Sequence, residues 1–174
     1  MQKTWSKEHE SGFVLLEPLL AIPLAAMLLT AFLTAGLWGL RSYVRILSDI
    51  ELHEELSTAM QRVVEDMETA QSVKISSSKG NSLLTLRSWT ENGRPGEILE
   101  YGRRYDYPTG TLKLVRDRAS NPLTGDHVFA RITVDRFFCE ELRPHCYRVV
   151  LIGRSMVSQH RYRLTTMIAQ EGRE

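Results

Sequence analysis

Residues 18–40 read PLLAIPLAAMLLTAFLTAGLWGL, a run without a single charged side chain. As an α-helix rising ~1.5 Å per residue, this run would extend ~35 Å, more than the ~30 Å hydrocarbon core of a bilayer. A soluble helix of this kind would have to be covered on every side, and the rest of the chain is too small to cover it. We therefore expect a transmembrane helix over residues 13–40.

A cleaved secretory signal is the alternative for an apolar segment this near the start of a chain. The apolar part of such a signal is ~7–15 residues long and ends in small residues. The run here is longer, and Leu37-Trp38-Gly39-Leu40-Arg41 is a poor cleavage site. A retained anchor is the better interpretation.

Charge is spread unevenly over the chain. The formal net charge is +1 for 174 residues, and a dedicated nucleic-acid binder usually carries a clear basic excess. Charged residues are absent from the apolar run but recur every few residues from Arg41 onward. This division indicates an anchor followed by one modest domain.

The helix is expected to continue past the apolar run, from about Val14 to Ser72. Residues 41–71 contain neither Pro nor Gly. Apolar side chains recur there at three- and four-residue steps, the period of a helix with one apolar face. They are Tyr43, Ile46, Leu47, Ile50, Leu56, Met60, Val63, Met67 and Ala70. Residues 41–72 are therefore predicted to be an amphipathic continuation that packs on a sheet.

Beyond residue 72 the pattern becomes extended. Residues 76–81 are predicted to form a loop, and Pro108-Thr109-Gly110 to join two strands into a hairpin. Alternating apolar and polar side chains predict the strands. They cover residues 84–89, 97–107, 111–117, 128–135, 147–153 and 160–168. The sequence thus predicts an α+β chain, with a long N-terminal helix packed on an antiparallel β-sheet over residues 73–174.

The segment Ser11-Gly12-Phe13-Val14-Leu15-Leu16-Glu17 adjoins the apolar run. A carboxylate at the edge of hydrocarbon either marks the membrane boundary or has a partner there. Gly, Phe, three aliphatic residues and Glu, after a short polar leader, resemble the prepilin signature. That signature is typical of type IV pilins and of the pseudopilins of type II secretion and competence systems. The family usually has Lys or Arg where this chain has Ser11.

The resemblance implies that residues 1–12 are a leader, which a prepilin peptidase removes between Gly12 and Phe13. It also implies N-methylation of Phe13 and a role for Glu17 in filament assembly. There the Glu17 carboxylate would neutralise the N-terminal amine of a neighbouring subunit, since a buried carboxylate is tolerable only when paired. The implied partners are the prepilin peptidase, other pilins or pseudopilins, an inner-membrane assembly platform and membrane lipid.

The resemblance also implies a location and a subclass. The chain would be a single-pass cytoplasmic (inner) membrane protein with its N-terminus in the cytoplasm, and part of a pilus or pseudopilus after assembly. Lys3 and Lys7 before the apolar run and Arg41 and Arg45 after it give the positive-inside rule no preference, so the orientation rests on the resemblance. The several strands of the C-terminal half resemble J-type minor pseudopilins and related minor pilins. They imply a pilin-like fold.

Cys139 and Cys146 enclose six residues that include Pro144. Outside the cytoplasm such a pair could form a disulfide, and the alternative is two thiols at strand ends. The distance between the two residues decides, and the sequence does not give it.

The sequence contains no pattern typical of an enzyme. It lacks a zinc-protease helix, a P-loop, a dinucleotide fingerprint and clustered Cys/His spacing, so no catalytic residue, metal or cofactor is expected. A group of basic and aromatic residues suggests a DNA-binding surface, but nearby acids favour a solvated sheet face, and nucleic acid is not an expected partner. The group comprises Arg94, Tyr101, Arg103, Arg104, Tyr105, Tyr107, Lys113, Arg116 and Arg118.

Two functions are therefore considered. The first is a minor pilin or pseudopilin, processed by prepilin peptidase and assembled as an initiating or tip component of a type IV pilus, type II secretion or competence pseudopilus. The second is a signal-anchored extracytoplasmic binding module that forms no filament. Removal of residues 1–12 distinguishes them.

Overall fold

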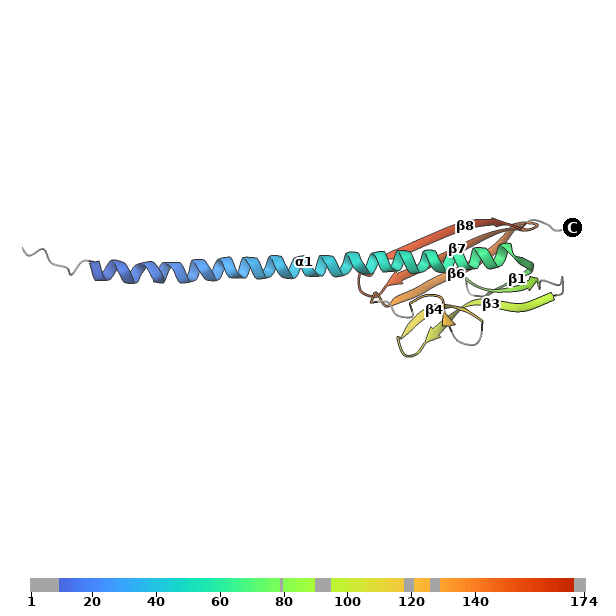
Figure 1. Cartoon of the computed structure of the whole chain (residues 1–174), viewed down its shortest axis with the longest axis horizontal. Helices are drawn as coiled ribbons and strands as arrows, with labels where there is room; N and C mark the ends of the chain where they lie inside the picture. The colour runs from blue at the N-terminus through green and yellow to red at the C-terminus, as the bar shows by residue number, and fades with distance from the viewer. Residues whose placement is uncertain (1–9, 79, 90–94, 118–120, 126–128, 171–174) are drawn as a thin grey trace, which may run out of the picture. The chain divides into compact units, whose positions relative to one another are not determined.

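The computed structural model describes residues 10–78, 80–89, 95–117, 121–125 and 129–170. These residues form an α+β fold with one long N-terminal helix followed by antiparallel strands (Figure 1). The helix is α1 (Glu10–Glu68). The strands are β1 (Ala70–Ser78), β2 (Asn81–Trp89), β3 (Pro95–Asp106), β4 (Thr111–Arg116), β5 (Asn121–Pro122), β6 (Ile132–Arg143), β7 (Cys146–Ser155) and β8 (Arg161–Ala169).

Within the described residues the strands form two antiparallel sheets, where the sequence predicted one. The first has the order β1-β2-β3-β4-β5 and the second the order β6-β7-β8. Strand β6 lies alongside the first sheet and is joined to it by side-chain hydrogen bonds. Ser82 Oγ accepts a hydrogen bond from the backbone amide of Cys139 (2.9 Å), and Thr133 Oγ1 accepts one from the backbone amide of Leu112 (3.1 Å).

The chain divides into two compact units, residues 1–44 and residues 45–174, and α1 contributes residues to both. In the second unit, one stripe of α1 is buried in a core that both sheets supply. The stripe consists of Ser48, Leu52, Leu56, Ala59, Met60, Val63 and Met67. It faces Leu84, Leu86, Tyr101 and Leu114 of the first sheet and Phe137, Cys139, Val149 and Leu151 of the second.

This stripe differs partly from the predicted one. Leu56, Met60, Val63 and Met67 are buried as expected, whereas Tyr43, Ile46 and Ile50 are at least half exposed. Periodicity alone does not reveal which side of a wide apolar surface meets the sheets.

The helix ends at Glu68, not at Ser72. Beyond it, Val73 and Ile75 sit at alternate positions of β1 and pack on the core, which favours an extended chain. The Gln170 side chain stabilises the helix end, because its amide donates to the carbonyls of Met67 (2.8 Å) and Ala70 (3.0 Å). Within the predicted loop over residues 76–81, residues 76–78 belong to β1, Gly80 is a turn and Asn81 begins β2, and the two strands pair up to Ser78 and Asn81.

The other strand predictions are correct in place but not in length. Strand β6 begins at Ile132 and runs to Arg143, well beyond the predicted end at residue 135. The short strand β5, which was not among the predicted strands, pairs with Val115 and Arg116 of β4.

Candidate functional site

The first candidate site is the apolar part of α1. Among the described residues, α1 is the one helix long and apolar enough to cross a membrane. From Leu19 to Leu40 its large apolar side chains are 55–75% exposed, so the chain itself covers none of them. The unit is therefore consistent with a single-pass membrane anchor.

The threonine hydroxyls in this part of α1 donate hydrogen bonds within the helix. The hydroxyl of Thr30 donates to the carbonyls of Ala26 (3.0 Å) and Met27 (2.8 Å), and that of Thr34 donates one turn back in the same way. The helix continues through Pro18 and Pro23. Internal satisfaction of this kind is what a hydrocarbon environment requires.

The predicted processing residues lie where little is described. Residues 1–9 of the expected leader lie outside the described part, and Gly12, Phe13 and Glu17 are described only as backbone within α1. The structure leaves the predictions of cleavage, methylation and filament assembly as predictions.

The group of basic and aromatic residues does not form one surface. The Tyr101 side chain is fully buried and donates to the Asp66 carboxylate on α1, which also pairs with Arg116 at 3.0 Å. Burial, together with this hydrogen bond, raises the pKa of Tyr101. Lys113 is buried beside Asp106, with Nζ and Oδ2 2.9 Å apart. Arg94 and Arg118 lie outside the described residues.

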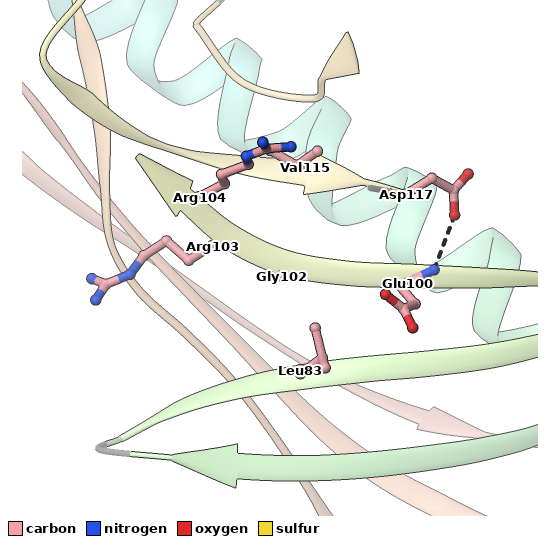
Figure 2. Close-up of a pocket in the computed structure, with 7 residues that line it drawn as sticks. All are labelled: Leu83, Glu100, Gly102, Arg103, Arg104, Val115 and Asp117. Atoms are coloured by element: carbon pink, nitrogen blue, oxygen red, sulfur yellow. Dashed lines mark hydrogen bonds between the residues drawn. The ribbon is translucent and has the colours of Figure 1, made fainter. Parts of the chain in front are cut away.

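Two members of the group, Arg103 and Arg104, project in different directions from β3 (Figure 2). The Arg103 guanidinium donates to the backbone carbonyl of Asp135 on β6, so it joins the two sheets. Tyr105 and Tyr107 contact each other edge to face, with ring centroids 5.1 Å apart, and Tyr107 is exposed. The residues that the sequence groups together thus serve several separate contacts.

A shallow groove lies on the outer face of the first sheet (Figure 2). Leu83, Gly102 and Val115 form its floor, and Asp117 closes one end by accepting the amide of Glu100 at 3.1 Å. A side chain at Gly102 would meet Leu83 at 3.0 Å, so the floor tolerates no residue larger than glycine without movement. The groove presents no nucleophile beside a base.

The two cysteines are free thiols on neighbouring strands. Cys139 pairs with Val149 across the ladder, whereas Cys146 pairs with Arg143 at the turn. Three residue steps of ~3.3 Å separate the two positions, too far for a disulfide. The possible Cys139–Cys146 bond is therefore absent from this structure. Burial raises the pKa of Cys139 to about 12, so its thiol stays protonated.

The outer face of the second sheet carries a set of arginines that sequence reasoning missed. Register places Arg136, Ile152 and Arg163 in one row, and Glu140, Arg148 and Met167 in another. We call this set the arginine face: Arg136, Arg148, Arg154, Arg161 and Arg163, around Phe138, Val150 and Ile152. Two carboxylates lie among these arginines. Asp135 pairs with Arg154 and Arg161, and Glu140 pairs with Arg148.

These arginines were not grouped on one face from the sequence, because they come from three separate strands. A bulge between Val134 and Arg136 also reverses the alternation, and it turns Arg136 outward although Val134 points into the core. Within β8, however, Arg161 and Arg163 share parity and could have been placed on one face from the alternation alone.

Comparisons with known proteins add no family to this description. No protein-family model, no curated protein and no solved structure matches the chain. Within the described residues, no group of three or more His, Cys, Asp or Glu side chains is placed to hold a metal ion.

Proposed function

We propose that the chain is a subunit of a type IV pilin-like filament, anchored by α1 and processed by a prepilin peptidase. In this proposal residues 1–12 are removed, Phe13 becomes the methylated N-terminus, and the domain lies outside the cytoplasm. The subunit would be a minor pilin or pseudopilin. It would initiate the assembly, or form the tip, of a pilus, a type II secretion pseudopilus or a competence pseudopilus.

One observation carries the proposal. A single helix serves as an apolar, uncovered segment in one unit and as a core element under antiparallel sheets in the other. An ordinary anchored domain needs only a short span and a linker, and it has no need to continue its anchor into its core. A filament subunit does benefit, because the uncovered part can associate with neighbouring helices while the same helix supports the core of the domain.

The N-terminal motif supports the same proposal. Gly12 offers a scissile bond without a side chain on its N-terminal side, and cleavage would free an amine with a pKa near ~7.7–8.0. Glu17, four residues after Phe13, would meet the amine of a neighbouring subunit in hydrocarbon. Two opposite charges there stabilise each other, whereas either alone is costly.

The test is N-terminal peptide analysis of the membrane-extracted full chain, produced with and without a prepilin peptidase. We expect a peptide that begins at Phe13, heavier by one methyl group, only when the peptidase is present. Gly12→Val should block cleavage, because the added side chain lies next to the scissile bond. Retention of residues 1–12 in both preparations would refute the proposal.

The role of Glu17 needs a separate variant. Glu17→Ala should be cleaved and inserted normally but be excluded from filaments, as measured by the amount of the variant in sheared filament fractions. Glu17→Asp, which keeps the charge, is the matched control and should retain part of the assembly. Normal incorporation of the alanine variant would remove Glu17 from the mechanism.

The second candidate is a signal-anchored extracytoplasmic binding module. The arginine face favours it, because a surface of this kind is useful without a filament. If residues 1–12 remain attached in the presence of the peptidase, this function takes the place of the first.

A further inference from the structure

Strand β8 is the regular, open edge of the second sheet. All nine of its residues pair with β7, from Arg154↔Arg161 to Cys146↔Ala169, without a register shift. Among the described residues no strand pairs with its other side. The outward backbone groups of such an edge form a template for a further strand.

The two faces of β8 differ in chemistry. Its outer face carries Arg161, Arg163, Thr165 and Met167, all exposed. On its inner face Tyr162 and Leu164 contact the core but remain only half buried, whereas Ile168 is 2% exposed. The core is therefore incompletely covered along one half of this edge.

Charge on this half of the edge is strongly basic. Arg161 is 67% exposed and shares Asp135 with Arg154, and Arg163 forms no ion pair within the described residues. The wider arginine face has five arginines around two carboxylates and contains no lysine. Arginine is suited to carboxylates because its planar guanidinium can bind both oxygens.

Self-association through the strand edges does not suit this surface. Among the described residues the sheets end in β1, β5, β6 and β8. Strands β1, β5 and β8 carry no Asp or Glu, and β6, which does, lies against the first sheet. Single-stranded nucleic acid is also a poor fit, because its bases stack on open aromatic rings. The one aromatic ring of the arginine face, Phe138, lies under the guanidinium of Arg136, 5.1 Å from the ring centroid.

We propose that β8 binds an extended acidic segment of a partner protein as an additional strand. Carboxylates at alternate positions of that segment would face Arg161 and Arg163. Apolar side chains at the intervening positions would cover Tyr162 and Leu164. Side chains two residues apart on a strand are separated by ~6.6 Å on both partners, so the two carboxylates match the two arginines in spacing.

The same arginines would discriminate between partners. A neutral or basic strand would leave two arginines desolvated against the edge, which is unfavourable. The edge is thus protected against indiscriminate pairing and open to one class of segment. This inference does not depend on the proposed filament function, since a binding module would use the edge equally well.

The test is binding of short labelled peptides to the full chain in detergent micelles, measured by fluorescence anisotropy at about physiological ionic strength. The probe is a peptide of alternating Glu and Val. We expect it to bind at least about tenfold more tightly than the same peptide with Lys in place of Glu. A peptide with a central Pro should bind weakly, because Pro interrupts strand pairing.

A charge exchange makes the result independent of folding losses. The Arg161→Glu/Arg163→Glu variant should no longer bind the Glu-Val peptide and should bind the Lys-Val peptide instead. The matched control, Arg62→Glu with Arg87→Glu, makes the same charge change at exposed positions away from β8 and should leave the preference intact. Circular dichroism verifies that both variants are folded.

Three outcomes would overturn the inference. The first is equal or absent binding of the Glu-Val and Lys-Val peptides. The second is a folded charge-exchange variant whose preference does not reverse. The third is a labelled oligonucleotide that binds more tightly than the Glu-Val peptide and is lost in the Arg161/Arg163 variant but not in the Arg62/Arg87 variant, which would assign the surface to nucleic acid.

Discussion

The two halves of α1 carry their apolar side chains in opposite ways. Residues 18–40 present them on all sides, exposed, whereas residues 52–68 collect them in one stripe that the sheets bury. The first half is therefore consistent with a hydrocarbon environment, whereas the second half is covered by protein. The difference shows that burial, not helix propensity, determines which residues of a helix matter for the stability of its domain.

The largest expected effect is a loss of domain stability when a buried leucine of the second half is replaced by alanine. The same substitution at an exposed leucine of the first half should have no such effect. Leu56 is fully buried against Gly153, where an added Cβ would lie 2.8 Å from the Leu56 methyl groups. Leu56→Ala should lower the free energy of unfolding of the domain by about 2–5 kcal/mol. Leu33→Ala should leave it unchanged, since Leu33 is 58% exposed. Chemical unfolding in micelles, followed by near-ultraviolet circular dichroism, measures both, and equal effects would contradict the comparison.

In a second experiment, on membrane insertion, the first half should be sensitive to substitution and the second half should not. Leu29→Arg should make membrane insertion less favourable by about 2.5–3.5 kcal/mol, because the charge lies near the middle of the apolar run. Glu54→Arg, at an exposed position of the second half, should not affect insertion. The fraction of inserted chains in a microsomal glycosylation assay is the readout. If both variants insert alike, residues 18–40 are not the anchor.

A third, smaller effect on stability concerns the hydrogen bond of Ser48, the polar residue at the start of the buried stripe. Ser48 Oγ and Ser155 Oγ are 2.5 Å apart and fully buried, and Ser155 Oγ also accepts the amides of Val157 (3.1 Å) and Ser158 (3.2 Å). Ser155→Ala should cost about 1–3 kcal/mol, since it leaves these donors without an acceptor. The Ser48→Ala/Ser155→Ala double variant should cost less than the sum of the singles. Strict additivity would show that the two hydroxyls act independently.

The smallest effect at neutral pH concerns Cys139, which lies in the core. Folding raises its pKa from 9.0 to about 12 by burial, so the folded state favours the protonated thiol. Its contribution to stability is therefore complete below pH 9 and is lost progressively as the pH rises towards about 12. The difference in unfolding free energy between the natural chain and Cys139→Ala, measured across this range, should shrink with pH. A constant difference would exclude this linkage.

Thiol labelling offers an independent check on the same residue. Cys146 is partly exposed at the β6–β7 turn and Cys139 is buried, so a maleimide should modify Cys146 first in the folded chain. Modification of both at equal rates would mean that the strands around Cys139 open readily.

Much of the fold follows from the sequence because period is a local property. The apolar run, the helical period through residue 67 and the alternation in β3, β4, β7 and β8 each require only neighbours along the chain. The helix end escaped prediction because Glu68 depends on distant contacts, namely Gln170 and the packing of Val73 and Ile75. The division into two sheets depends on β6, whose bonds to Leu112 and Ser82 no local pattern reveals.

The candidate sites divide in the same way. The candidate membrane span was predictable, because it needs only length and composition. The arginine face was not, since it requires the β6–β7–β8 register and the bulge before Arg136. The basic and aromatic residues around β3 are dispersed for the converse reason: residues close in sequence, such as Arg103 and Arg104, point to opposite faces of a strand.

The burial of one stripe of α1 between the sheets also has a mechanical consequence. Within the second unit, a pull along the helix would load the contacts from Ser48 to Met67 in shear, all at the same time. Contacts loaded together resist more force than contacts that peel apart one by one. Because Gln170 binds the carbonyls of Met67 and Ala70 at the end of the helix, the residue after the last strand would share this load, and the core would hold the buried stripe along its whole length.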